Sequence, residues 1–168
     1  MSESTFRIVP LSKEHDKSLR IEFNSGCAPL DRYFKEQVTQ DVRKNTARCY
    51  VAIHGDVIAG FYTLASAQIN LHDIPLEIAR KLPRYDDVPV IRIGRLAVDM
   101  NFRGKKLGTL MLYDACRRTN DGPAGSFALT VDSKDETAKA FYLHHDFIPL
   151  KNHPSTLFFP IANAGFMK

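Results

Sequence analysis

A strand–helix–strand unit in the middle of the chain constrains the fold more than any other feature. The stretch VIRIGRLAV, residues 90–98, is rich in β-branched residues and predicts a strand. Apolar residues recur at helical spacing in KKLGTLMLYDACRRT, residues 105–119, and after the break GPAG the stretch SFALTV, residues 126–131, predicts a second strand. Because two strands joined through a helix pair in parallel, we expect part of the central sheet to be parallel.

Strands and helices continue on both sides of this unit and predict one α/β (α+β) domain. The sequence contains no internal repeat or linker, and 168 residues suit a single core, so the predicted domain covers residues 1–168. Its expected architecture is a mixed, partly parallel central sheet flanked by helices. The other predicted elements are an edge strand at 5–11, a helix at 27–45, hairpin strands at 48–54 and 57–69, a helix at 75–82, a loop between Pro83 and Pro89, a helix at 134–145, and closing strands in FIPL and STLFFPI.

Composition and cysteine usage are those of an ordinary globular protein. Hydrophobic residues make up 44% of the chain, and no apolar run approaches the roughly 18 residues that a membrane span needs. Cys27, Cys49 and Cys116 lie far apart without CxxC spacing, which favours neither a disulfide framework nor a metal site and indicates a cytoplasmic location. The net charge of +4 is compatible with an anionic partner such as a nucleotide, an RNA or an acidic protein.

The predicted strand at 90–98 leads directly into a loop suited to an anion. This loop, DMNFRGKKLG at 99–108, carries Arg103, Lys105 and Lys106 just before the helix. A helix N-terminus presents free N–H groups and the positive end of the helix dipole, and the cations strengthen that field. Neither GxxxxGK[ST] nor GxGxxG occurs, so this is not a Walker or Rossmann phosphate site. A plain turn with solvated cations is the alternative interpretation.

The segment IGRLAVDMNFRGKKLGTLMLYDA, residues 93–115, resembles motif A of the GNAT N-acetyltransferases. That motif consists of a strand, the loop pattern R/Q-x-x-G-x-G/A and a helix. Arg103 stands at the first position of the loop pattern and Gly108 at its last. Lys106 replaces the middle glycine, a position at which glycine permits a positive φ or a close approach. The resemblance implies the GNAT fold and an N-acetyltransferase that uses acetyl-CoA as co-substrate.

A second segment, ETAKAFYLHHDF at 136–147, resembles the same family. Ala138 and Tyr142 fall on the family's A-x-x-x-Y spacing, and Asp146 replaces the glycine that commonly precedes the aromatic residue. Aspartate tolerates the left-handed backbone region better than most residues. The two motifs have the order and the spacing of the family.

Longer segments are similar to one subgroup, the GNAT toxins of type II toxin–antitoxin systems. The segments are FNSGCAPLDRYFKEQ, VIAGFYTLASAQI, PVIRIGRLAVD and SKDETAKAFY. This resemblance implies that the chain acetylates the α-amino group of aminoacyl-tRNA and blocks translation. It also implies a cognate small DNA-binding antitoxin and a homodimer.

The resemblance further implies roles for individual residues. The backbone of Leu96, Ala97 and Val98 is expected to bind the pantetheine arm and the thioester. Tyr142 is expected to be the general acid for the leaving thiolate, since a phenol is protonated at neutral pH, and a core aromatic role is the alternative. The pyrophosphate is expected to bind Arg103, Gly104, Lys105, Lys106, Leu107, Gly108 and Thr109.

The sequence offers no evident general base, which fits an α-amine acceptor. Such an amine has a pKa of about 7.7–8.0, so a useful fraction is neutral without help, whereas a lysine side chain near 10.4 is almost fully protonated. Two further acceptors stay open: a small amine or polyamine, and a protein amine. A non-catalytic GNAT-like binding module is a third alternative.

Several other polar residues have two interpretations each. Arg92 and Arg95 lie in a predicted central strand and face either an acceptor phosphate or an acidic side chain. His144 and His145 are expected at a helix end rather than in a metal site, because adjacent residues on a helix point in different directions. A tRNA surface or a solvated basic face is expected for Lys35, Arg43, Lys44 and Arg48.

Overall fold

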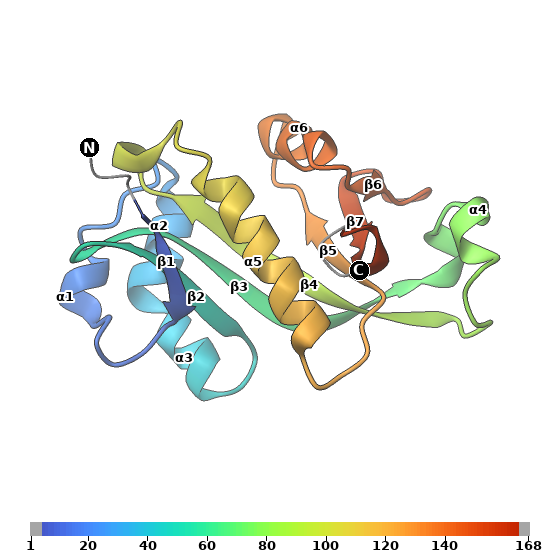
Figure 1. Ribbon diagram of the computed structural model, residues 1–168, viewed down its shortest axis with the longest axis horizontal. Coiled ribbons are helices and arrows are strands. Elements are labelled where there is room, and N and C mark those ends of the chain that lie inside the picture. Colours follow the sequence, from blue (N-terminus) through green and yellow to red (C-terminus); the bar gives the residue numbers. More distant parts are fainter. Residues whose placement is uncertain (1–4, 165–168) are drawn as a thin grey trace. The chain divides into compact units, whose positions relative to one another are not determined.

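The computed structural model describes residues 5–164, and within them seven strands pair into one mixed sheet in the order β1-β2-β3-β4-β5-β7-β6 (Figure 1). The strands are β1 (Arg7–Pro10), β2 (Arg48–His54), β3 (Val57–Asn70), β4 (Asp87–Val98), β5 (Ala128–Asp132), β6 (Ile148–Pro149) and β7 (Thr156–Pro160). The helices are α1 (Lys17–Arg20), α2 (Ala28–Glu36), α3 (Val38–Arg43), α4 (Leu76–Ala79), α5 (Leu107–Asp121) and α6 (Glu136–His144), with 3-10 helices η1 (Leu71–Asp73), η2 (Met100–Phe102) and η3 (Ile161–Asn163).

The chain divides into two compact units. Within the described residues, the first unit contains 5–65 and 94–115, and the second contains 66–93 and 116–164. Strands β3 and β4 and helix α5 contribute residues to both units.

The first unit is built on antiparallel strands β1, β2 and the first part of β3. A two-residue turn joins β2 to β3, and Gly55 in it has a φ of +61°, a conformation that glycine adopts without strain. The predicted hairpin is therefore confirmed. Among the described residues 5–164, strand β1 pairs only with β2 and forms the end of the sheet order, as expected for an edge strand.

Aromatic side chains of α2 fill the core of the first unit. Phe34 stacks on Phe61 with ring centroids 4.2 Å apart, and Phe23 contacts both rings edge-on. The predicted single helix at 27–45 is wrong, because α2 and α3 are separate helices with a break at Gln37. Val38 packs into the same buried cluster as Phe34, the residue four positions before it.

The second unit contains the parallel part of the sheet. Strands β4 and β5 pair in parallel from Val90 with Ala128 to Ile93 with Val131, which confirms the expectation from the strand–helix–strand unit. Strand β7 lies antiparallel between β5 and β6. The side chains of Leu129 and Phe158 are fully buried in this unit.

Two local predictions in the second unit are wrong. Helix α4 is shorter than the predicted 75–82, because after Ala79 the chain tightens into turns in which Leu82 N–H donates to the Ala79 carbonyl. Pro89 lies inside β4 instead of closing a loop. Its position is exposed, and its carbonyl accepts a hydrogen bond from Phe127 N–H at 2.9 Å.

Candidate functional site

The C-terminal part of β4 extends beyond its pairing with β5. The last parallel pair joins Ile93 to Val131, while β4 continues to Val98. Leu96, Ala97 and Val98, which are expected to bind pantetheine, lie in this extension. The side chain of Ala97 is buried. Backbone N–H and C=O groups along a strand edge without a neighbouring strand need other partners, and the amides of a pantetheine arm can supply them.

A turn with an unusual backbone precedes helix α5. Lys106 has a φ of +62°, in the left-handed region, at the position where the family motif carries glycine. Gly104 also has a positive φ, of +77°. Leu110 N–H donates to the Lys106 carbonyl at 3.1 Å, so the helix begins immediately after the turn. Lys106 therefore adopts a positive φ, a conformation that glycine adopts without strain, at the position directly before the helix.

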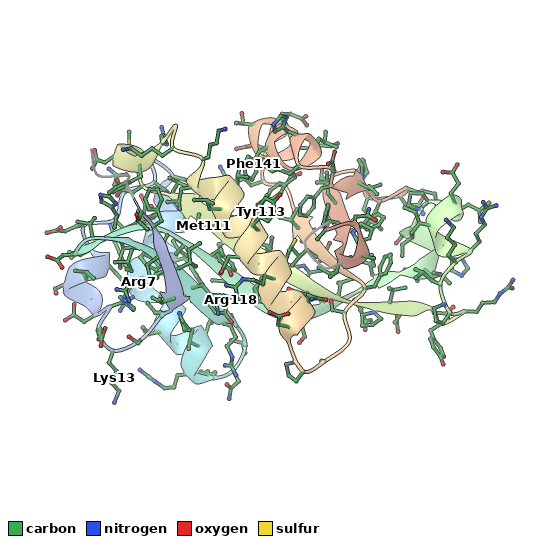
Figure 2. All side chains as sticks on the ribbon, in the orientation of Figure 1. Arg7, Lys13, Met111, Tyr113, Arg118 and Phe141 are labelled. Atoms are coloured by element: carbon green, nitrogen blue, oxygen red, sulfur yellow. The ribbon has the colours of Figure 1, made fainter. Side chains whose placement is uncertain are left out.

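Helix α5 anchors this turn through one apolar face. Leu107, Met111 and Ala115 are almost completely buried, as their spacing predicts. Figure 2 shows Met111 and Tyr113 on this helix, and Tyr113 is 60% exposed. The N-terminus of α5 is thus held by packing, while the charged turn in front of it stays at the surface.

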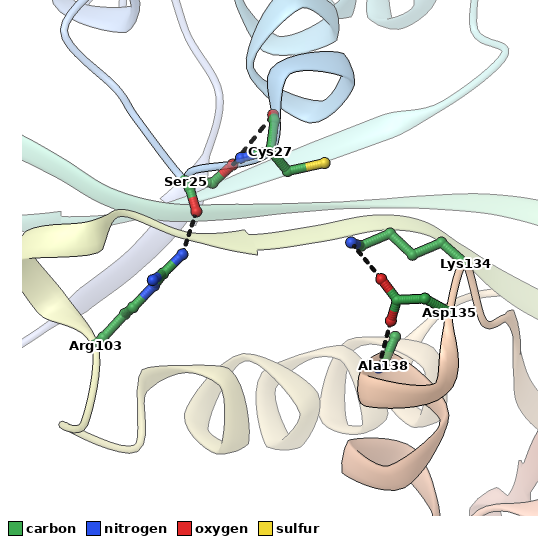
Figure 3. Close-up of polar contacts among 6 residues, drawn as sticks. All are labelled: Ser25, Cys27, Arg103, Lys134, Asp135 and Ala138. Atoms are coloured by element: carbon green, nitrogen blue, oxygen red, sulfur yellow. Dashed lines mark hydrogen bonds and ion pairs between the residues drawn. The ribbon is translucent and has the colours of Figure 1, made fainter.

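The Arg103 side chain has a partner within the protein. Its Nη2 donates to the Ser25 carbonyl at 2.6 Å (Figure 3). Gly26 follows with a φ of +84°, and a Cβ there would lie 2.8 Å from Arg103 Nη2. The guanidinium therefore ties the loop before α2 to the turn before α5 through one of its five N–H groups.

Asp99 is a structural member of this site that sequence reasoning missed. Its side chain is 4% exposed, and its two oxygens accept hydrogen bonds from Asn24 N–H and Asn101 N–H, both at 2.9 Å. Met100 N–H donates to the Asn24 carbonyl at 2.9 Å. The available signal was an aspartate directly after an apolar strand, which is a typical N-cap residue, but its distant partner Asn24 has no signature in the sequence.

Tyr142 lies on α6 in the second unit. Asp135 caps this helix by accepting a hydrogen bond from Ala138 N–H at 2.8 Å (Figure 3). The Tyr142 side chain is 6% exposed and packs 5.2 Å, centroid to centroid, from Phe147. Burial raises the pKa of Tyr142 above its ordinary value. Its hydroxyl makes no hydrogen bond with any residue of the range 5–164, so the ring is packed while the hydroxyl keeps its proton and its bonding capacity.

The two strand arginines differ in their partners. Arg92 Nε lies 3.7 Å from Asp132 Oδ2. Of the two partners expected for Arg92, a phosphate or an acidic side chain, the structure therefore shows the acidic side chain. Arg95 instead stacks on an aromatic ring, with its guanidinium carbon 3.6 Å from the centroid of Tyr33. Cys116 is buried, and burial raises its pKa to about 11, so it is a core residue.

The remaining candidates lie at exposed or partly exposed positions. His145 Nδ1 is 2.8 Å from the Phe141 carbonyl at the end of α6, as expected for a helix-end histidine. Arg43, Lys44 and Arg48 are exposed within one short stretch between α3 and β2, and Lys35 is partly buried on α2. No group of three or more His, Cys, Asp or Glu side chains within 5–164 could hold a metal ion, and no helix there is long and apolar enough to cross a membrane.

Comparison with known proteins places this architecture in a family. The profile of the acetyltransferase (GNAT) family matches residues 13–147, which include the β4 extension, the turn before α5 and Tyr142. The chain belongs to the GNAT acetyltransferases. The "tRNA-acetylating toxin" of Mycobacterium tuberculosis is 37% identical to this GNAT chain over 128 residues, which cover 74% of this chain and 75% of the relative.

Solved structures agree with the fold. A tyrosine-to-phenylalanine mutant of KacT superimposes with a TM-score of 0.86 at 25% identity, covering 97% of this chain and 99% of KacT. AtaT complexed with acetyl-methionyl-tRNA has the same TM-score of 0.86 at 23% identity, again with 97% and 99% coverage. AtaT is also known bound to the C-terminus of the antitoxin AtaR and acetyl-CoA. The predicted GNAT fold is confirmed.

Proposed function

We propose that this GNAT chain transfers the acetyl group of acetyl-CoA to the α-amino group of aminoacyl-tRNA and thereby blocks translation in the cytoplasm. The observation that carries the proposal is the 37% identity to a tRNA-acetylating toxin, and the positive φ of Lys106, where the family motif has glycine, supports it. The net charge of +4 supports a polyanionic acceptor.

In this proposal the cofactor is held by two stretches of the first unit. Backbone groups of Leu96, Ala97 and Val98, beyond the last β4–β5 pair, bind the pantetheine arm. The segment Arg103–Thr109 binds the pyrophosphate with the N–H groups that begin α5 and with the charges of Lys105 and Lys106. The bound co-substrate supplies an activated acetyl group as a thioester.

The chemical step needs a neutral amine and a proton donor. The acceptor nitrogen attacks the thioester carbon, the carbon–sulfur bond breaks, and the amine releases a proton to solvent. We assign the protonation of the leaving thiolate to Tyr142, whose phenol is protonated at neutral pH, and the resulting tyrosinate takes a proton back from solvent. No basic residue is required, because an α-amine with a pKa of about 7.7–8.0 is partly neutral at pH 7.5.

The proposal includes partners and domain organisation. We infer that residues 1–168 act as one acetyltransferase domain and that the protein forms a homodimer. A cognate antitoxin is proposed because AtaT, which shares the fold, has been solved with its antitoxin. A toxin of this kind needs such a partner to be held inactive.

A cell-free translation reaction tests the proposal. Protein and acetyl-CoA together should stop translation, and the Tyr142→Phe variant should largely restore it. Labelled acetyl should appear on charged tRNA but not on deacylated tRNA, which lacks the amine. Label on polyamines or on protein, with none on charged tRNA, would contradict the tRNA acceptor. Absence of acetyl transfer to any amine would favour a binding module.

A further inference from the structure

Arg95 is a partly buried cation without a carboxylate partner. It lies on β4, one residue before the backbone assigned to the cofactor, and no ion pair joins it to any acid among residues 5–164. Its neighbour Arg92 has such a partner in Asp132. A partly buried guanidinium that is not neutralised within the protein is costly, and its natural partner is an anionic ligand.

The position of Arg95 is fixed at both ends. Its backbone N–H donates to Thr63 Oγ1 at 3.1 Å, and Thr63 is 2% exposed. Gly94 permits this contact, because a Cβ there would lie 2.9 Å from the same oxygen. At the other end the guanidinium lies over the ring of Tyr33, whose hydroxyl donates to Asp41 Oδ2 at 2.8 Å. The cation is therefore preorganised rather than mobile.

Stacking leaves the hydrogen-bonding edge of Arg95 available. A guanidinium binds an aromatic ring through its face, while its five N–H groups point outward in its plane. That planar fork matches two oxygens of a phosphate or a carboxylate. The arrangement thus offers a partly buried, oriented anion receptor in the first unit.

The position of Arg95 along β4, relative to the proposed cofactor segments, indicates which anion would bind it. With the pyrophosphate at residues 103–109, which follow β4 in the chain, a pantetheine arm on the backbone of Leu96, Ala97 and Val98 would place the thioester nearer to Arg95 than the phosphates. An anion that binds Arg95 would then belong to the acceptor rather than to the phosphate end of the cofactor. In an aminoacyl-tRNA the amino acid carboxyl is esterified, and the nearest negative charge is the phosphodiester of the terminal nucleotide.

We propose that Arg95, stacked on Tyr33, binds the terminal phosphodiester of the acceptor and sets the preference for charged tRNA over free amines. This inference rests on the proposed function, since it assigns a part of the same acceptor site. Tyr33 acts as a positioning residue that holds the guanidinium flat.

The test compares two acceptors that differ in phosphate. One is a mixture of charged tRNAs. The other is the set of matching 3′-(aminoacylamino)-3′-deoxyadenosines, which keep the α-amine and the terminal nucleoside without phosphate. For Arg95→Met we expect kcat/KM to fall about 10- to 100-fold with charged tRNA, because a hydrogen bond between charged groups is lost. With the nucleosides we expect kcat/KM to fall less than about threefold. The fall with charged tRNA should appear mainly in KM.

Matched variants separate specific binding from charge and folding. Arg32→Met removes one exposed cation from α2 and should leave kcat/KM for charged tRNA within about threefold of the parent. Arg95→Lys keeps the charge but lacks the fork, so its loss should fall between parent and Arg95→Met. Thermal unfolding monitors folding of each variant.

The outcomes distinguish this inference from the proposed function. An equal loss with both acceptors would overturn the phosphate role, because Arg95 would then support structure. An unchanged kcat/KM for charged tRNA would overturn it as well. A parent protein that acetylates the nucleosides but not charged tRNA would overturn the proposed function itself and this inference with it.

Discussion

At the scale of single residues, the left-handed backbone at Asp146 carries a measurable cost. Its φ is +67° directly after α6, a position where helices commonly end in glycine. Glycine adopts this conformation freely, so we predict that Asp146→Gly raises the free energy of unfolding by about 0.5–1 kcal/mol. Urea unfolding measures the change. As a control, the β-branched variant Asp146→Val should lower the free energy of unfolding. A glycine variant no more stable than the parent would show that the backbone at Asp146 is not strained.

The role of Tyr142 as general acid can be tested with a single substitution. Tyr142→Phe keeps the packed ring and removes only the hydroxyl, so turnover should fall by about 10²–10⁴-fold while acetyl-CoA affinity changes little. Steady-state kinetics and calorimetric titration give the two readouts. Tyr85→Phe removes an exposed hydroxyl from the same unit and should have no effect on either. Turnover of Tyr142→Phe within threefold of the parent would leave the tyrosine a packing residue.

At the scale of elements, the N-terminus of α5 is the proposed pyrophosphate site. Gly108 lies in its first turn, and Gly108→Glu places a negative charge beside the phosphates. Because an acidic side chain in the first turn favours the helix itself, folding should be preserved while acetyl-CoA affinity falls about tenfold or more. Calorimetric titration measures the affinity, with Gly125→Glu as the control in a loop with open space. Equal affinity in both variants would place the nucleotide elsewhere.

Asp99 joins two elements of the first unit, the loop before α2 and the 3-10 helix η2. Asp99→Ala leaves the N–H groups of Asn24 and Asn101 without their acceptors, so we predict a loss of about 2–3 kcal/mol in the free energy of unfolding. Asp99→Asn retains one oxygen and should lose less. Chemical denaturation of the parent, Asp99→Asn and Asp99→Ala gives the order of their stabilities. An alanine variant as stable as the parent would show that the Asp99 contacts are dispensable.

At the scale of the whole molecule, the positive charge should govern tRNA binding. Neutralising Arg43, Lys44 and Arg48 should reduce the slope of log K against log salt by roughly two to three, since each phosphate contact contributes about 0.7–0.9. Binding titrations from low to physiological salt give the slope. The control neutralises Arg80, Lys81 and Arg84, three exposed cations of the second unit. An identical change in both triple variants would indicate that only net charge matters.

Several parts of this protein follow from local sequence pattern alone. Residues 90–131 specified a parallel strand–helix–strand unit because strand and helix periodicities are local, and the connection between them leaves one pairing direction. The same holds for the hairpin at Gly55 and for the buried face of α5. The motif also located the turn at Lys106, although its positive φ had to be seen in the structure.

Tertiary structure alone decided the contacts that hold the site together. Arg103 meets the Ser25 carbonyl across 78 residues of chain, and Asp99 meets Asn24 across 75. No periodicity encodes such pairs, because they arise only when packing brings distant loops together. The break of the expected helix at Gln37 and the stacking of Arg95 on Tyr33 likewise belong to the tertiary structure, because no local pattern marks them.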